Sequence, residues 1–161
     1  MSEGRWLDEE EARAWRSLQR MHLRLNAALG HDLAAHSELS QQDYIVLVVL
    51  TERPEGALRL FELGHELGWE KSRVSHQVTR MAARGLVEKF VCSSDRRGQL
   101  VRVTEQGRND IAAAAPSHVS AVRRFFVDRL SRDQLGQVAA AAEGVLQGLE
   151  EVCPEAAEAW G

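Results

Sequence analysis

The chain has few cysteines and few prolines, and each of these two shortages excludes some classes of protein. Its two cysteines, Cys92 and Cys153, lie far apart in 161 residues, so no disulfide framework is expected. Only three prolines occur and no segment is repetitive, so we expect ordered structure over nearly the whole chain. Basic residues are almost all arginine, with lysine only at Lys71 and Lys89. A hydrophobic fraction of 44% is enough to form a core.

Long hydrophobic runs are also missing. No apolar stretch approaches the ~20 residues that a membrane-spanning helix needs. The first residues, Met-Ser-Glu-Gly-Arg-Trp-Leu-Asp-Glu-Glu-Glu, are acidic and lack the apolar centre of a signal peptide. We therefore expect a cytoplasmic protein that does not bind membranes.

Charge is distributed unevenly along the chain. The formal net charge is -4, yet residues 70–97 hold seven basic and three acidic side chains, which gives +4 for that segment. The remaining 13 basic and 21 acidic residues therefore carry -8. A basic segment in an acidic chain predicts a surface that binds a polyanion, and we interpret this one as a DNA-binding surface.

Hydrophobic periodicity predicts a mainly helical chain with one small β-hairpin, an α+β fold. The expected helices cover residues 8–36, 44–52, 61–67, 71–84, 105–130 and 134–152, and the expected strands cover residues 58–60, 86–92 and 99–103. Ser40, Thr104 and Ser131 are placed to cap the helices that follow them. Pro116 is expected to kink the fifth helix.

The helices over residues 61–67 and 71–84 meet at Gly68-Trp69, which is the spacing of a helix-turn-helix. On the second of them, Val74, Val78 and Met81 share one face and can anchor the helix to the domain. The remaining surface carries short polar and basic side chains that suit base edges and phosphates in a major groove. The residues predicted to contact DNA there are Lys71, Ser72, Arg73, Ser75, His76, Gln77, Thr79 and Arg80.

Short motifs in a fixed order show which family the chain resembles. They are Glu62-Leu63, Leu67-Gly68, Arg84-Gly85-Leu86-Val87, Asp95-Arg96-Arg97 and Val103-Thr104-Glu105-Gln106-Gly107. Together they resemble the MarR family of bacterial winged-helix transcriptional regulators, over essentially the whole chain. The resemblance implies an N-terminal dimerisation helix in residues 1–38, a winged helix-turn-helix in 39–107 and C-terminal dimerisation helices in 108–161, within one compact domain.

The resemblance also implies roles for single residues in the wing, the predicted hairpin that follows the helix-turn-helix. Arg97 matches the arginine that enters the minor groove, Asp95 matches the acidic residue that braces it, and Arg96 belongs to the same contact. Asp95 also suits a hairpin turn by itself. Two positions depart from the family pattern. Phe61 replaces the usual Ser or Thr cap and Gly64 replaces a helix former, so we expect this helix to be loosely held or to rely on packing by Phe61.

The same resemblance implies a homodimer that represses transcription and is released by a small aromatic or anionic ligand. Apolar residues in the first helix, in residues 119–130 and in the last helix exceed what one buried stripe needs, as expected at an interface between two copies. A two-fold dimer predicts a pseudo-palindromic operator in double-stranded DNA. Trp15, His22, Tyr44 and Trp69 are candidates to bind the ligand, with core packing as the alternative for each.

Other functions fit the sequence less well. His31 and His36 lie five residues apart on different helix faces, without a nearby cysteine or carboxylate cluster, so we predict no metal site. No nucleophile–base pair or phosphate-binding glycine loop indicates an enzyme, and no cofactor is expected. The alternatives are a winged-helix protein-interaction module, which would present apolar residues on the recognition face, and a redox- or metal-responsive regulator of the same fold.

Overall fold

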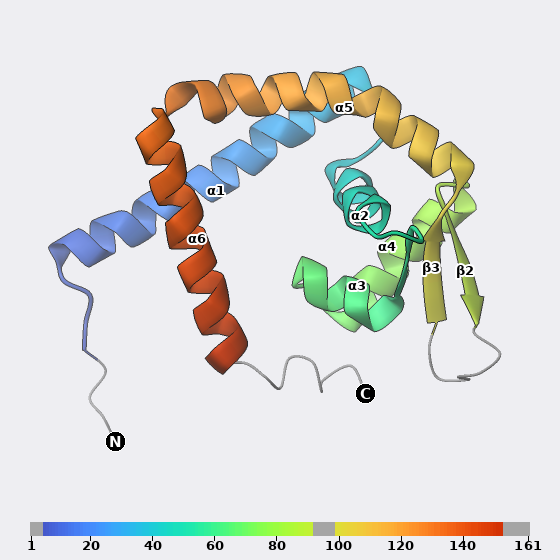
Figure 1. Cartoon of the computed structure of the whole chain (residues 1–161), viewed down its shortest axis with the longest axis horizontal. Coiled ribbons are helices and arrows are strands. Elements are labelled where there is room, and N and C mark those ends of the chain that lie inside the picture. Colours follow the sequence, from blue (N-terminus) through green and yellow to red (C-terminus); the bar gives the residue numbers. More distant parts are fainter. Residues whose placement is uncertain (1–4, 92–98, 153–161) are drawn as a thin grey trace.

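A computed structural model describes residues 5–91 and 99–152, which contain helices, a short 3₁₀ turn and a small sheet. The elements are α1 (Glu9–His36), α2 (Gln41–Thr51), β1 (Ala57–Arg59), α3 (Leu60–Leu67), α4 (Lys71–Ala83), β2 (Val87–Val91), β3 (Gln99–Val103), α5 (Glu105–Phe125), η1 (Val127–Arg129) and α6 (Arg132–Val152). Helices α1 and α5 pack against each other, and α2, α3, α4 and the strands form a lobe beside them (Figure 1). This arrangement confirms the predicted α+β fold.

Long α6 stands apart from the lobe (Figure 1). Within the described residues it makes no extensive contact with any other element, and almost all of its side chains are exposed. No helix in the two described ranges is long and apolar enough to cross a membrane.

The sheet is antiparallel, with β3 between β1 and β2. Strands β2 and β3 form the predicted hairpin, in which Val91 pairs with Gln99. Val101 and Val103 are 0% and 4% exposed, whereas Arg102 between them is exposed, as the alternation of a half-buried strand requires. The hairpin therefore rests one face on the lobe and turns the other to solvent.

The hydrophobic core lies between α2, α3, α4 and the sheet. Helix α2 is apolar on nearly all sides, and its Val46, Leu47 and Leu50 are fully buried, as predicted. The other elements contribute the buried side chains Leu63, Val74, Val78, Met81, Leu86 and Val101. Because burial of apolar surface is the main favourable contribution to folding, this core fixes the lobe. It holds α4 by one face only and leaves the other face free.

The three predicted helix caps are confirmed. Ser40 Oγ accepts from the Asp43 amide at 3.1 Å, and Thr104 Oγ1 accepts from the Gly107 amide at 3.0 Å. Ser131 Oγ accepts from the Gln134 amide at 3.2 Å. Each bond satisfies an amide that the first turn of a helix would leave unpaired.

Helix α5 ends at Phe125, earlier than the predicted residue 130. Phe126 leaves helical geometry with φ of -128° and ψ of -64°, and η1 follows. The end is stabilised by Arg129, whose Nε donates to the Arg124 carbonyl oxygen at 3.0 Å, a group that the helix itself no longer pairs. Pro116 lies inside α5, which bends along its length in Figure 1.

Packing by Phe61 is one of the two alternatives predicted for α3, and it is only partial, since Phe61 is 42% exposed. The N-cap residue of α3 is Arg59, two positions before Phe61. Glu62 Oε2 accepts from the Arg59 amide at 2.8 Å, at the start of the helix. The far end is closed by Gly68, whose φ of +60° is the left-handed conformation that ends many helices. Glu62 therefore satisfies the amide of the N-cap residue itself, which is the carboxylate half of a capping box.

Two family motifs that lie about 20 residues apart meet in space. Gly85 ends α4 with φ of +75°, and its carbonyl oxygen accepts from Thr104 Oγ1 at 2.6 Å. The Leu86 carbonyl oxygen accepts from the amide of Thr104 at 3.2 Å and, as the longer part of a bifurcated bond, from the same hydroxyl at 3.1 Å. The first turn of α5 lies so close that a Cβ on Gly107 would be 2.2 Å from the same oxygen. The motifs are therefore two halves of one junction, which joins α4, the hairpin and α5.

Candidate nucleic-acid interface

Helix α4 presents a polar, basic face to solvent. Its anchor is the predicted one, since Val74, Val78 and Met81 are all 0% exposed. Of the residues predicted to contact DNA, Ser75 is half-buried and six are exposed: Lys71, Ser72, Arg73, His76, Thr79 and Arg80. An α-helix anchored by one face, with short polar and cationic side chains on the other, has the shape and chemistry that a major groove admits.

Gln77 is a correction to the predicted set. It is only 3% exposed, and its Nε2 donates to Asp43 Oδ1 at 2.7 Å, so it cannot reach DNA. Val74, Gln77, Val78 and Met81 follow the i, i+3, i+4, i+7 spacing of one helix face. That spacing was available in the sequence. The polar side chain was misleading because its hydrogen-bond partner comes from α2.

Lys89 extends the cationic surface from α4 onto β2. It is exposed, and its Nζ donates to Thr79 Oγ1 on α4 at 3.0 Å. Sequence reasoning counted this lysine in the basic segment but did not place it among the DNA contacts. Strand alternation alone could not show that β2 runs beside the exposed face of α4.

Trp69, a predicted ligand contact, lies two residues before the first residue of α4. The Arg73 guanidinium carbon is 4.2 Å from the centroid of a Trp69 ring, a cation–π contact. Trp69 is half-buried and packs against the core. The indole therefore supports a side chain on the exposed face of α4.

Arg84 also belongs to the basic segment of residues 70–97, but its guanidinium pairs with groups of the protein itself. Its Nη1 donates to Asp43 Oδ2 at 2.6 Å and its Nη2 to the Glu38 carbonyl oxygen at 2.7 Å. Burial by itself would raise the pKa of Asp43. The hydrogen bonds from Ser40 and from Arg84, with the charge of Arg84, outweigh burial and lower that pKa below 3.8. Asp43 is therefore ionised at neutral pH, and Arg84 ties the end of α4 to the start of α2.

The predicted wing contacts Asp95, Arg96 and Arg97 lie outside the described residues. The strands that carry this segment are described up to the pair of Val91 and Gln99. The roles of Asp95, Arg96 and Arg97 therefore stay a prediction.

The other ligand candidates do not come together in the described structure. Trp15 is 52% exposed on α1, and the ring of His22 is hydrogen-bonded to Asn26 Nδ2 at 3.0 Å. Tyr44 is 8% exposed and its ring centroid is 4.3 Å from that of His118 on α5. Burial raises the pKa of Tyr44. Burial lowers the pKa of His118, and the negative charge of Asp32, which by itself would raise it, is the smaller effect. Tyr44 and His118 thus form an uncharged contact between α2 and α5.

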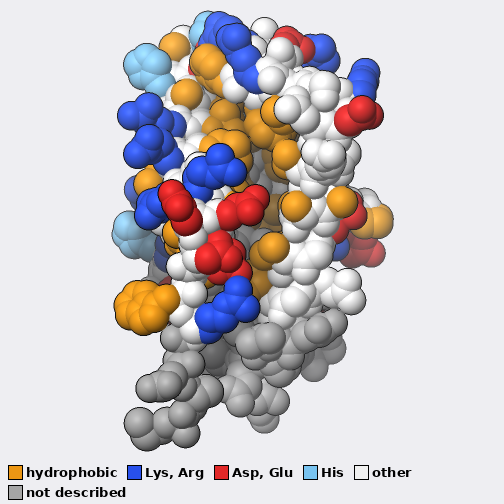
Figure 2. All heavy atoms as spheres, turned by 90° about the vertical axis from the view of Figure 1, so that its left-hand side faces the viewer, with side chains coloured by type: hydrophobic (Ala, Val, Ile, Leu, Met, Phe, Trp, Pro, Cys, Tyr) orange, Lys and Arg blue, Asp and Glu red, His pale blue; other side chains and the backbone are white. Residues whose placement is uncertain are grey.

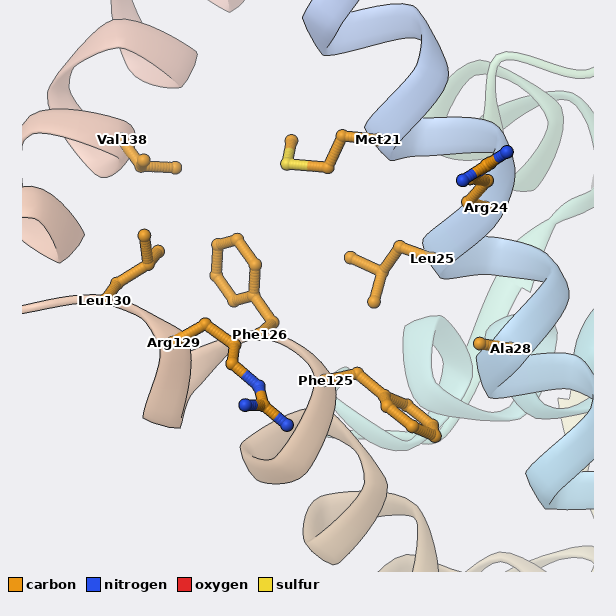
Figure 3. Close-up of a pocket in the computed structure, with 9 residues that line it drawn as sticks. All are labelled: Met21, Arg24, Leu25, Ala28, Phe125, Phe126, Arg129, Leu130 and Val138. Atoms are coloured by element: carbon orange, nitrogen blue, oxygen red, sulfur yellow. The ribbon is translucent and has the colours of Figure 1, made fainter.

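A separate, apolar hollow lies away from the lobe, between α1, the end of α5 and the first half of α6. Figure 2 shows hydrophobic side chains gathered along it, bordered by charged ones. It contains an open pocket of about 380 Å³. The lining residues are Met21, Arg24, Leu25, Ala28, Phe125, Phe126, Arg129, Leu130 and Val138 (Figure 3). None of the four predicted ligand residues lines this pocket, and no group of three or more potential metal ligands occurs in the described ranges.

Solved structures of similar proteins decide the family. AbsC from Streptomyces coelicolor, a MarR family transcriptional regulator, is 36% identical to this chain, with 92% of this chain and 99% of AbsC covered and a TM-score of 0.84. The chain belongs to the MarR family. MarR proteins are transcriptional regulators and not enzymes, which agrees with both predictions made from the motifs.

Two further similar structures were solved with a bound molecule. Sco3205, a MarR family regulator from Streptomyces coelicolor in complex with DNA, is 35% identical, with 93% of this chain and 94% of Sco3205 covered and a TM-score of 0.86. CouR from Rhodococcus jostii RHA1, bound to p-coumaroyl-CoA, is 25% identical, with 80% and 87% covered and a TM-score of 0.69. No family model and no curated relative matches the chain.

Proposed function

We propose that this MarR protein is a homodimeric repressor that binds a pseudo-palindromic operator through α4 and the wing. The observation that carries the proposal is the solvent-facing surface of α4, with Lys71, Arg73 and Arg80 exposed and Lys89 beside them. The DNA-bound structure of Sco3205, at 35% identity, supports the same use of the fold. Operator binding places the protein in the cytoplasm, where the DNA is.

Exposed apolar surface supports the dimer. On α6, Val145, Leu146 and Leu149 are 63%, 60% and 54% exposed, although helices in proteins gain most of their stability from packing of an apolar face. On α1, Leu18 is 52% and Met21 is 42% exposed, next to the apolar hollow. Apolar surface of this extent marks an interface, and a second copy of the chain carries a matching set. We therefore assign α1, α5 and α6 to dimerisation and residues 39–107 to DNA binding.

Loss of a cationic contact should weaken operator binding without unfolding the protein. We expect Arg80→Ala or Arg97→Ala to cost roughly 1–3 kcal/mol of binding free energy per half-site, about tenfold or more in affinity. Gel-shift titrations against a duplex selected by the wild-type protein measure the change. Affinity of the wild type should also fall steeply as salt rises, because phosphate contacts release counterions.

Arg5→Ala is the matched control, because Arg5 is also an exposed arginine but lies before α1 and pairs with Glu11 at 3.2 Å. Its affinity should equal that of the wild type. Equal affinity of all three variants would refute the assignment of the DNA-binding surface.

Charge placed on α6 should separate the dimer. In light scattering we expect twice the chain mass of 18.0 kDa for the wild type and a single chain mass for Leu146→Glu combined with Leu149→Glu. Each chain would have to bury two unpaired carboxylates in the interface, at a cost of several kcal/mol. Gln137→Glu, a charge at an exposed polar position of the same helix, should stay dimeric. A dimeric double variant would place the interface elsewhere.

The proposal includes release from DNA by a small aromatic or anionic ligand. It is supported by CouR, which was solved with p-coumaroyl-CoA. Titration of the protein–DNA complex with aromatic carboxylates tests it. A complex that no such compound dissociates would argue for regulation without an effector of this class.

A further inference from the structure

A line of hydrogen-bonded side chains runs from the connection between α1 and α2 to the exposed face of α4. Arg84 binds the Glu38 carbonyl oxygen at 2.7 Å and Asp43 Oδ2 at 2.6 Å. Asp43 Oδ1 accepts from Gln77 Nε2 at 2.7 Å, and Gln77 Oε1 accepts from the Arg80 guanidinium. Asp43 and Gln77 are 2% and 3% exposed, whereas Arg80 is exposed. A buried network thus ends on an arginine of the proposed DNA surface.

The chemistry of the network fixes which way the Gln77 amide points. An ionised carboxylate only accepts hydrogen bonds, so Asp43 requires the amide to turn its NH₂ group inward. The amide oxygen then faces outward, where the Arg80 guanidinium can only donate. Asp43 itself is held by the Ser40 amide at 2.9 Å and by Arg84. The orientation of each group therefore follows from the one before it.

We propose that Gln77 is a positioning residue for DNA recognition, which holds the Arg80 guanidinium in place without touching DNA. The inference rests on the proposed DNA-binding function. A free arginine loses its rotamer freedom when it binds, whereas one held beforehand loses less. Arg80 has five N–H donors, so a bond to Gln77 leaves the others for a guanine or a phosphate.

A double-mutant cycle separates positioning from a purely structural role. Gln77→Met keeps the length of the side chain but removes both hydrogen bonds. We expect it to weaken binding to a duplex selected from a randomised library by about two- to tenfold, the effect of one newly mobile side chain. In the Arg80→Ala background the same change should alter affinity less than about 1.5-fold, because there is no guanidinium left to position. A role confined to folding would weaken binding equally in both backgrounds.

Two further variants keep the test decisive. Gln41→Met is the control, because Gln41 is a half-buried glutamine on α2 that donates to Asn26 at 3.3 Å, toward α1; its affinity should not change. Asp43→Asn keeps the shape of the network but lets the Gln77 amide turn either way. It should reproduce the loss in the wild-type background and not in Arg80→Ala. Thermal unfolding confirms that each variant is folded, and Asp43→Asn replaces Gln77→Met in the cycle if the latter is not.

The possible outcomes separate a failure of the proposed DNA-binding function from a failure of the positioning role of Gln77. Failure of the wild type to enrich any duplex would overturn the proposed function and this inference with it. Specific binding that Arg80→Ala weakens, but that Gln77→Met leaves unchanged or weakens equally in both backgrounds, would overturn the inference alone. Specific binding that Arg80→Ala does not weaken would remove Arg80 from the DNA surface, and Gln77 would then have nothing to position.

Discussion

Gly107→Ala is expected to destabilise the protein by about 3 kcal/mol or more, which lowers the thermal midpoint by roughly 6 to 12 °C. The added Cβ would lie 2.2 Å from the Leu86 carbonyl oxygen and 3.0 Å from Val103 Cγ2. A flexible side chain could move away, but this oxygen belongs to the backbone and accepts two hydrogen bonds from Thr104. Relief of the clash must therefore pull the first turn of α5 away from the junction. Calorimetry at a fixed protein concentration measures the shift.

Gly136→Ala is the matched control. Gly136 also lies in a helix, but apart from its own stretch of helix no atom of the described residues lies within 4 Å of the position that its Cβ would take. Alanine favours a helix over glycine by about 1 kcal/mol, so the thermal midpoint should stay the same or rise. If Gly107→Ala behaved like Gly136→Ala, the close approach of α5 to Leu86 would be wrong. The family motif that ends in Gly107 would then need another explanation.

Arg84→Ala is expected to cost about 2 to 3 kcal/mol of unfolding free energy at neutral pH. Removal of one partner from a buried ion pair usually costs more, but the Arg84 side chain is 44% exposed and water replaces part of its contribution. In this variant Asp43 is still buried and ionised, but it accepts one strong hydrogen bond fewer. Urea unfolding monitored by circular dichroism gives the value. Arg123→Ala removes a pair with Asp128 whose two side chains are 61% and 51% exposed, and it should change stability by less than about 1 kcal/mol.

The same variant should show a characteristic pH dependence. In the folded wild type the pKa of Asp43 lies below its ordinary value of 3.8. Its stabilising contribution is therefore complete above about pH 4 and is lost as the pH falls through the folded pKa. Once Asp43 is protonated it carries no charge, so the loss of the Arg84 guanidinium then costs less unfolding free energy. The stability difference between wild type and Arg84→Ala should thus be largest at neutral pH and narrow below pH 4, and an equal difference at pH 7 and pH 3 would contradict the proposed ion pair.

Much of the fold can be predicted from the sequence because its signals are local. The caps at Ser40, Thr104 and Ser131 depend on residues three positions away, and the buried face of α4 depends on a spacing within one helix. The cationic face of α4, which we propose to bind DNA, is predictable for the same reason. Cationic and short polar side chains on one helix face, in a basic segment of an acidic chain, already indicate which face α4 turns outward.

Contacts between residues that lie far apart in the sequence could not be predicted in this way. Gln77 was assigned to DNA because its partner, Asp43, is 34 positions away, and the arginine that neutralises the same carboxylate is 41 positions away. Lys89 was missed as a neighbour of Thr79 because nothing in the sequence places β2 beside the exposed face of α4. Likewise, four aromatic or imidazole side chains looked alike as ligand contacts, and only packing separated the exposed Trp15 from the buried Tyr44.

The amino-acid sequence alone determined the order of helices and strands, the family and the cationic helix, since these depend on residue types and on spacings within a few turns. Tertiary structure decided which of those polar groups face solvent and which are used inside the protein. A buried carboxylate must be paired, and its partners come from whichever segments the core brings near it. That requirement placed Arg84 and Gln77 with Asp43 and left Arg80 at the surface.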